Sequence, residues 1–411
     1  MKKVVGLILA LMLLIPVGLY AQVEAAAGSI TIGVHFDAAF RYSGKDENKV
    51  WRDIDDDGTL DQEDWNGYET FNGEALILAL SGKIGDKVNW RFQEAFVLPY
   101  YLNSGMSGVY PSTLGELDHP VTLEACAQWK PIDQLGITIG RVLVPTAIAN
   151  VPHMLKVHHM ANPPLIITGG FNGKLNSLPT YQTGVALDVN FAGINLNYML
   201  YNGELEGQDF TFGGSDLAID VDKSKGGNVA LTYNGDVGPG KLTARAFYFQ
   251  EYSDITDDLA AGLGVDDDAS ISGWGIGVMY NADNYFGGVE YITNTLDPED
   301  PDNPATPNID ESETQTGYGY YVLLGGRFSS IEFAFRYDFI DWSDLDAHKD
   351  KDTETWYNIA LSYLINDNAT IGIGYTIKQP EKPDDDTATP VDESEIPNID
   401  ELQVFLELDL L

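Results

Sequence analysis

The sequence contains little cysteine and little positive charge. Its single cysteine, Cys126, excludes an intramolecular disulfide framework. Its 23 basic residues stand against 63 acidic ones, which gives a formal net charge of −40. Because nucleic acids attract basic surfaces, this balance argues against a nucleic-acid partner. It also argues against a basic anchor on a membrane surface.

Long hydrophobic runs are also missing beyond the N-terminus. Val4 to Leu19 is an apolar run broken only by glycines and Pro16, and it is shorter than the ~20 residues that a membrane-spanning helix needs. Lys2 and Lys3 precede it and alanine-rich small residues follow it. This pattern is typical of a secretory signal peptide. We predict that residues 1–27 are a signal peptide, cleaved after Ala21 or Ala27, and that residues 28–411 form one exported domain.

The region after the leader has a strict two-residue periodicity. From Ser29 to Ser43 every even position is apolar or aromatic, whereas the odd positions are mostly small or polar. Such alternation predicts a β-strand with two different faces. The pattern recurs to the end of the chain in sixteen segments. They are centred near residues 36, 77, 92, 125, 139, 187, 197, 231, 246, 276, 290, 322, 335, 360, 373 and 406.

The connections between these segments alternate in length. Seven are tight turns, such as Ala192-Gly193 and Ser329-Ser330, and eight are long, polar and mostly acidic. Short turns at one end and long loops at the other are typical of an outer-membrane barrel. A soluble β-sandwich would show the same alternation, but the leader, the loop asymmetry and the charged second face favour the barrel. The long loops cover roughly residues 44–66, 99–119, 145–180, 202–225, 253–269, 294–316, 341–354 and 379–401.

We therefore predict an all-β fold, a transmembrane antiparallel β-barrel of about 16 strands in the outer membrane. Its short turns would be periplasmic, its long loops extracellular, and both termini would lie at the periplasmic side because the strand count is even. Tyrosine and tryptophan near strand ends suit the two interfaces between water and lipid. These aromatic residues are Trp129, Tyr252, Tyr291, Tyr318, Tyr320, Tyr337 and Trp356.

Charged residues on the polar face of the strands would line the interior of the barrel. Opposed charges across a pore orient water and dipolar solutes, although the same residues could equally be paired wall charges with no selective role. Arg141 lies where its strand leaves the alternation, and Glu124, Asp188 and Glu407 also face inward. The candidate pore-lining residues are Asp37, Arg41, Arg91, Arg141, Arg245, Glu290, Arg327, Glu332, Arg336 and Asp338.

The first long loop contains a D-x-D-x-D-G pattern, which is typical of calcium-binding loops. Gly58 would allow the sharp turn, and Asp64 takes the place of the usual bidentate glutamate. No helical pattern flanks the motif, so it suggests a calcium loop inserted between strands. The candidate ligands of Ca²⁺ are the side chains of Asp53, Asp55, Asp57, Asp61 and Asp64 and the carbonyl of Thr59.

Most of the acidic residues lie in the long loops. They are either simply a soluble surface, or they bind divalent cations that bridge neighbouring lipopolysaccharide molecules and set a negative potential at the pore mouth. On the second interpretation the mouth would favour cations. The expected partners are outer-membrane lipid, lipopolysaccharide and small hydrophilic solutes.

The chain resembles the 16-stranded porins of Gram-negative bacteria over almost all of residues 29–411. The stretch from Gly136 to Pro145 (GITIGRVLVP) is similar to the strand that precedes the third loop in the phosphate-selective porin group. The resemblance implies a homotrimer and a third loop, residues 145–180, folded into the lumen. There His153, Lys156, His158 and His159 would line the constriction, and the three histidines would either bind a metal, sense pH or simply rest against the wall. Because this loop offers few lysines and the mouths are acidic, we do not expect phosphate preference.

An enzymatic function is not expected, since the sequence has no G-x-S-x-G motif and no evident nucleophile–base set. The sequence therefore predicts a porin for passive diffusion of small hydrophilic solutes and ions, leaning toward cations. Two alternatives stay open: a structural or adhesive calcium-binding barrel, and an anion-selective porin of the phosphate type. The chain ends in Leu410-Leu411, unlike the usual barrel-assembly signal, which ends in an aromatic residue.

Overall fold

The structure is a computed structural model. It describes residues 22–25, 28–43, 49–52, 61–64, 68–97, 116–150, 159–160, 164–168, 178–179, 181–202, 210–212, 215–217, 225–254, 268–298, 315–341, 353–366, 368–380 and 399–409. Almost all of these residues are in β-strands; the one described helix is the short α3 (Leu165–Thr168). No helix in the described ranges is long and apolar enough to cross a membrane.

Sixteen strands form one continuous wall, and each coincides with one of the sixteen predicted segments. The alternation of apolar and polar residues alone is enough to locate them. The wall consists of β2 (Gly28–Ser43), β5 (Tyr68–Ile84), β6 (Val88–Val97), β7 (Glu116–Ile132), β8 (Leu135–Leu143), β9 (Tyr181–Phe191), β10 (Ile194–Asn202), β13 (Lys225–Val237), β14 (Gly240–Asp254), β15 (Asp268–Ala282), β16 (Tyr285–Pro298), β17 (Gln315–Phe328), β18 (Ile331–Asp341), β19 (Thr353–Asn366), β20 (Ala369–Pro380) and β21 (Ile399–Asp409).

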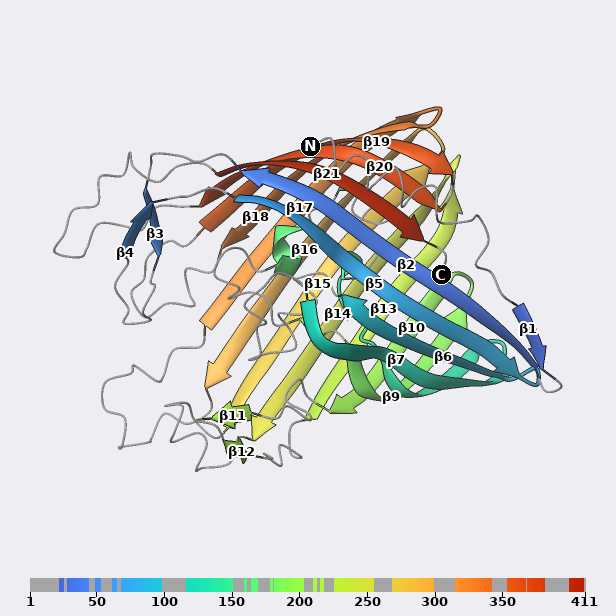
Figure 1. Ribbon diagram of the computed structural model, residues 1–411. Helices are drawn as coiled ribbons and strands as arrows, with labels where there is room; N and C mark the ends of the chain where they lie inside the picture. Colours follow the sequence, from blue (N-terminus) through green and yellow to red (C-terminus); the bar gives the residue numbers. More distant parts are fainter. Residues whose placement is uncertain are drawn as a thin grey trace, which may run out of the picture.

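The wall is a closed antiparallel barrel. Each strand pairs with the next along the chain, and the last strand, β21, pairs with the first, β2. Figure 1 shows these two strands side by side, blue against red, although they lie at opposite ends of the sequence. Closure leaves no open sheet edge in the wall, which is the condition for a sheet to cross a bilayer.

The connections follow the predicted alternation of short and long. Seven consecutive strand pairs are joined by tight turns, such as the one at Ala192 and Gly193, which have φ angles of 50° and 83°. Positive φ at two central residues is typical of turns whose twist matches that of a hairpin. The predicted turn Gly235–Gly240 is shorter than expected, because β13 extends to Val237 and β14 begins at Gly240.

A few short strands lie outside the sixteen. β3 (Lys49–Arg52) and β4 (Asp61–Asp64) form a hairpin in the first long loop, and β11 (Phe210–Phe212) pairs with β12 (Ser215–Leu217) in the fourth. Both pairs lie beyond the end of the wall where the long connections are (Figure 1). β1 (Gln22–Ala25) pairs with the beginning of β2, at the opposite end.

The two faces of the wall differ as the alternation predicts. On the outer face large apolar side chains are exposed, for example Ile276 at 54% and Leu361 at 50%. Aromatic rings form rows across neighbouring strands there: Trp274 lies 5.4 Å from Tyr291, and Tyr291 lies 6.0 Å from Tyr318. Trp356 does not belong to these rows, contrary to the prediction. It lies on the inner face of β19 and is buried against Leu165 and Ile340.

Candidate functional site

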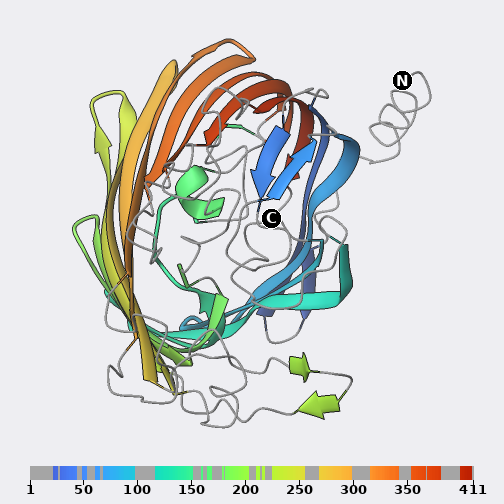
Figure 2. The ribbon, with the colours of Figure 1, turned by 90° about the vertical axis from the view of Figure 1, so that its left-hand side faces the viewer.

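The inner wall of the barrel is the candidate site, and part of it is packed against the third loop. Residues of β14 to β18 that face inward are buried, although sheet alternation alone would leave them in an open lumen. Figure 2, a view into the ring of strands, shows α3 inside the ring. The contacts of the described loop residues 144–150, 159–160 and 164–168 explain this burial.

The first contact ties the start of the loop to Glu290 on β16. The backbone amides of Ile148 and Ala149 donate to the two carboxylate oxygens of Glu290 at 2.6 and 3.2 Å. The Tyr321 hydroxyl donates to the same carboxylate at 3.3 Å. Hydrogen bonds to a carboxylate are roughly twice as strong as neutral ones, so Glu290, which is 1% exposed, is a strong anchor for the loop.

Arg245 on β14 holds the same segment from the neighbouring side. Its Nη1 donates to the carbonyl oxygens of Thr146 and Ala147 at 3.2 and 3.3 Å. The register places Gly277 of β15 between Arg245 and Glu290. A Cβ atom at Gly277 would lie 2.8 Å from Oε1 of Glu290 and 3.0 Å from Cδ1 of Ile148. The absence of a side chain at this position therefore lets the loop reach the wall.

The second contact involves His159, the one described residue among the predicted constriction residues. Its Nδ1 lies 2.7 Å from Oε1 of Glu332, and its ring stacks on Phe286 with centroids 3.7 Å apart. Arg327 donates from Nε to the other oxygen of Glu332 at 2.6 Å. His159 thus rests against the wall in a network of charges. His153, Lys156 and His158 lie outside the described residues.

The third contact is apolar. α3 packs on β17 and β18, and its residue Leu165 is fully buried with Ile340 and Trp356. Beside it, Ile166 and Ile167 belong to a larger buried cluster. The wall contributes bulky apolar side chains to this cluster, on the face that the alternation predicts to be polar. These inward-facing apolar residues are Phe247, Phe249, Phe286, Ile292, Tyr321 and Leu323.

A fully buried polar network lies next to α3. Nε of Arg336 donates to both oxygens of Asp338 at 2.9 Å. Asn358 donates to Asp338 at 2.6 Å, and Thr376 donates to Asn358 at 2.8 Å. Arg336 and Asp338 are both 0% exposed. Arg336 and Asp338 therefore bind each other rather than facing open solvent.

The wall around β6 to β10 is more open. The Arg91 side chain is 55% exposed and lies 3.4 Å from Glu124. Asp188 accepts hydrogen bonds from Asn197 at 2.8 Å and Gln128 at 3.4 Å. The exposure of Arg91 makes it the clearest candidate among the described inner charges for contact with a solute.

Three predicted positions remain. Asp37 points inward and lies 2.9 Å from His35. Arg41 lies on β2 in register with Gln403 and Thr70. Arg141 follows Gly140, which has a φ of 123°, and its Nε donates to the carbonyl of Thr122 at 2.9 Å.

The calcium motif lies mostly outside the described residues. Of its six candidate ligands, Asp61 and Asp64 are described, and their backbones form the two ends of β4. Asp53, Asp55, Asp57 and Thr59 lie outside the described ranges. The hairpin of β3 and β4 brackets this part of the chain.

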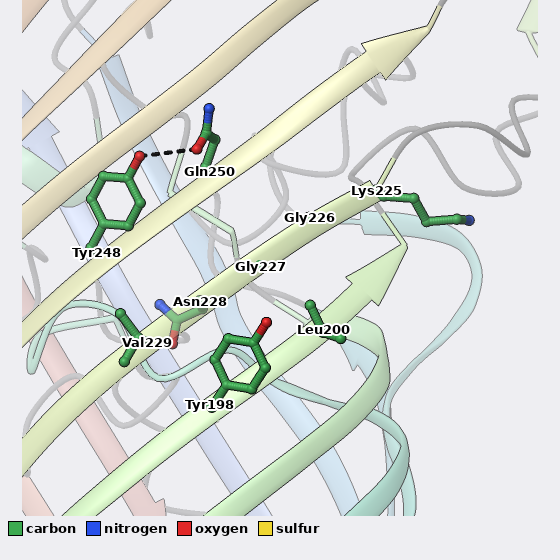
Figure 3. A pocket seen from close by; sticks show the side chains of 9 residues that line it. All are labelled: Tyr198, Leu200, Lys225, Gly226, Gly227, Asn228, Val229, Tyr248 and Gln250. Atoms are coloured by element: carbon green, nitrogen blue, oxygen red, sulfur yellow. Dashed lines mark hydrogen bonds between the residues drawn. The ribbon is translucent and has the colours of Figure 1, made fainter.

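A shallow hollow of about 340 Å³ lies on the outer face, over β10, β13 and β14. The register places Gly227 between Leu200 and Gln250, so the absence of a side chain leaves a gap in that row (Figure 3). Tyr198, Val229 and Tyr248 form the next row. The hollow is turned away from the interior and is separate from the inner wall.

Comparison with known proteins gives matches in structure alone. No protein-family model matches the chain, and no curated protein matches it. The anion-selective porin from Comamonas acidovorans matches with a TM-score of 0.59 and 13% identity, over 93% of this chain and 100% of that one. The outer membrane channel DcaP of Acinetobacter baumannii matches with a TM-score of 0.53 and 12% identity, over 94% and 99%.

OmpF of Salmonella typhi, in a complex with daunomycin, matches with a TM-score of 0.54 and 10% identity, over 95% of this chain and 100% of that one. Identities this low show the fold and no more. The chain has the closed 16-strand barrel fold of the outer-membrane porins.

Proposed function

We propose that this protein is an outer-membrane porin through which small hydrophilic solutes and ions diffuse passively. The observation that carries the proposal is a closed 16-strand wall with an apolar, exposed outer face and a charged inner face. A barrel of this size leaves an aqueous channel unless a plug fills it. The structural neighbours whose titles name a porin or an outer membrane channel support the same function.

We propose that the third loop narrows the channel from the side of β14 to β18. Its described residues are held against β14 to β18 by Glu290, Arg245 and Glu332 and by the apolar contacts of α3. A solute therefore passes on the side where Arg91 is exposed. Fixing the loop to one side of the ring gives a constriction of stable width, because its anchors are buried charged hydrogen bonds.

The channel favours cations over anions. The chain carries a net charge of −40, and fixed negative charge near a pore mouth raises the local concentration of cations. On the inner wall, arginines are matched by acidic neighbours, as in the pairs of Arg336 with Asp338 and Arg327 with Glu332. Because these inner-wall charges are paired, the remaining acidic residues of the chain determine that the channel favours cations over anions.

Liposome swelling tests the channel directly. Liposomes containing the refolded barrel should swell in isotonic solutions of small neutral sugars, at rates that fall as the sugar becomes larger. Liposomes with heat-unfolded protein are the control. Absence of swelling with well-folded protein would contradict the porin function and favour a closed structural or adhesive barrel.

The protein is exported by a cleaved signal peptide and assembles as a homotrimer surrounded by lipid and lipopolysaccharide. One structural neighbour is titled as the trimer form of OmpT from Vibrio cholerae, and the exposed apolar outer face can be buried between copies as well as in lipid. Light scattering of the detergent complex should give three chains. A single chain at all concentrations would refute the trimer.

Calcium binds in the first long loop, on the motif that begins at Asp53. Oxygen-rich loops with this spacing suit Ca²⁺, and the hairpin of β3 and β4 holds the ends of the segment together. Calorimetry with Ca²⁺ should show binding in the parent and none after Asp55→Asn combined with Asp57→Asn. Equal Ca²⁺ binding by the parent and the double variant would show that calcium binds outside this motif.

A further inference from the structure

The barrel closes where its first strand meets its last, and a compact set of metal-binding side chains lies at this seam. β2 and β21 pair over nine residues, from His35 opposite Asp409 to Ser43 opposite Glu401. Within this ladder Asp37 is directly opposite Glu407. His35 is two residues from Asp37, so both side chains lie on the inner face.

The three side chains are close and buried. Nε2 of His35 lies 2.9 Å from Oδ2 of Asp37. One ligand atom from each of His35, Asp37 and Glu407 can be chosen so that all three lie within 4.8 Å of one another. The exposed fractions of the three residues are 0%, 3% and 5%. The neighbouring positions in the same row are Ala75 on β5 and Thr370 on β20.

Asp37 and Glu407 place two carboxylates face to face in this row, and both take part in further interactions within the protein. Like charges directly opposite each other across a strand pair repel, and burial increases the cost because the charged groups lose water. A divalent cation held between the two carboxylates would offset both negative charges and gain from direct coordination.

The donor atoms select the kind of cation. One imidazole nitrogen and two carboxylate oxygens suit Zn²⁺, Mn²⁺ or Co²⁺, whereas Ca²⁺ and Mg²⁺ prefer oxygen ligands alone. Bonds of about 2.0–2.2 Å separate the ligand atoms of such an ion by about 3–3.6 Å. Because the chosen ligand atoms lie within 4.8 Å of one another, rotation of the two carboxylates is enough to bring them into this range.

We propose that His35, Asp37 and Glu407 bind a divalent transition-metal ion, of the class of Zn²⁺, that fastens the seam of the barrel. Two of its ligands come from β2 and the third from β21, so the ion links strands that are separated by almost the whole sequence. The site forms only when the barrel has closed. Metal binding therefore stabilises the closed barrel over any open sheet.

Cobalt is a suitable probe because its bound form absorbs visible light. The untagged, refolded barrel is titrated with Co²⁺ in the presence of excess Ca²⁺, which occupies oxygen-only loop sites. We expect about one Co²⁺ per chain, displaced by Zn²⁺. His35→Gln and Glu407→Gln should each weaken binding by about 10–100-fold or more.

His159→Gln is the matched control, because His159 is another buried inner-wall histidine in contact with a glutamate. It should bind Co²⁺ like the parent. The temperature at which the barrel unfolds in SDS should rise with Zn²⁺ in the parent and in this control, and not in Glu407→Gln. Heat-modifiable migration on a gel shows that each variant is folded before it is compared.

Three results would overturn the proposal. The first is that the folded parent binds no metal. The second is that Glu407→Gln binds metal as tightly as the parent, and the third is that only His159→Gln loses binding. If His35→Gln does not fold, Glu407→Gln decides the outcome. If neither folds, Asp37→Asn replaces them, and unchanged binding in that variant contradicts the assignment.

Discussion

Glu290 is the side chain on which the position of the third loop depends most. It accepts two backbone amides of the loop and a tyrosine hydroxyl, all within hydrogen-bonding distance. Backbone amides carry no sequence signature, so the alternation predicted that Glu290 faces inward without revealing its partner. Its backbone partners in the loop lie about 140 positions earlier in the sequence.

Replacing Glu290 by alanine should loosen the loop. Each buried donor left unsatisfied costs about 1–3 kcal/mol, so the loop detaches while the wall remains closed. We expect larger single-channel current noise and faster cleavage of the loop by added protease. Asp188→Asn, on the wall around β9, is the control and should change neither quantity. Equal noise in both variants would show that Glu290 does not hold the loop.

A substitution at Gly277 tests whether the third loop lies directly against the wall at this position. A valine there places atoms within 3 Å of Glu290 and close to Ile148, so the loop must move toward the channel axis. We expect a lower conductance with unchanged folding. The control is Gly227→Ala on the outer face, where a Cβ meets Leu200 Cδ2 at an ordinary 3.7 Å. A normal conductance in Gly277→Val would argue against this packing.

Arg91 tests where the solute passes. Its side chain is 55% exposed, whereas its partner Glu124 is 8% exposed, and a glutamine at position 91 keeps an N–H donor for this carboxylate. Arg91→Gln should therefore leave folding intact and raise the permeability ratio of K⁺ to Cl⁻, because a positive charge leaves the path. Arg327→Gln, in a partly buried pair with Glu332, should have a smaller effect on the ratio. An unchanged ratio in Arg91→Gln would show that ions do not pass close to Arg91.

At the scale of elements, α3 holds the third loop against β17 and β18 through buried apolar contacts. Leu165→Asp should release it, because an isolated carboxylate is not stable in an apolar site. We expect higher conductance and protease cleavage near this position. Leu165→Met keeps the volume and should behave like the parent, since such swaps usually cost less than ~1.5 kcal/mol. Parent-like conductance in Leu165→Asp would refute the anchoring role of α3.

The wall strands were predictable because their signal is local. Alternation along one strand, as in β18, shows its two faces without knowledge of any partner. Turn residues such as Ala192 and Gly193 mark where strands end. Boundaries such as that of β13 at Val237 were less certain, since polar residues continue into the turn.

The packing inside the barrel was not predictable in the same way. Phe247 and Phe249 lie on the inner face, where the alternation predicts polar residues. Only the loop that covers them explains why both are apolar. Trp356 was assigned to the outer aromatic rows because it is an aromatic residue near a strand end, and its position one residue out of phase with Tyr357 is what places it inside. The alternating pattern of β19, followed residue by residue, places Trp356 on the inner face.

At the scale of the whole molecule, the proposed function rests on closure and charge. The closed wall removes every free edge among its sixteen strands, and the net charge of −40 is the basis of the proposed preference for cations. Screening weakens such fields at high ionic strength, where the Debye length falls to about 3 Å at 1 M salt. Any preference for cations should therefore be largest in dilute salt.

The most direct measurement is the single-channel reversal potential of the refolded barrel in a planar bilayer under a tenfold KCl gradient. We expect stepwise conductance with a reversal potential of the sign that K⁺ preference gives, and a smaller potential when both solutions are made more concentrated. A reversal potential of the opposite sign would contradict the cation preference, and the absence of conductance steps from folded protein would contradict the channel itself.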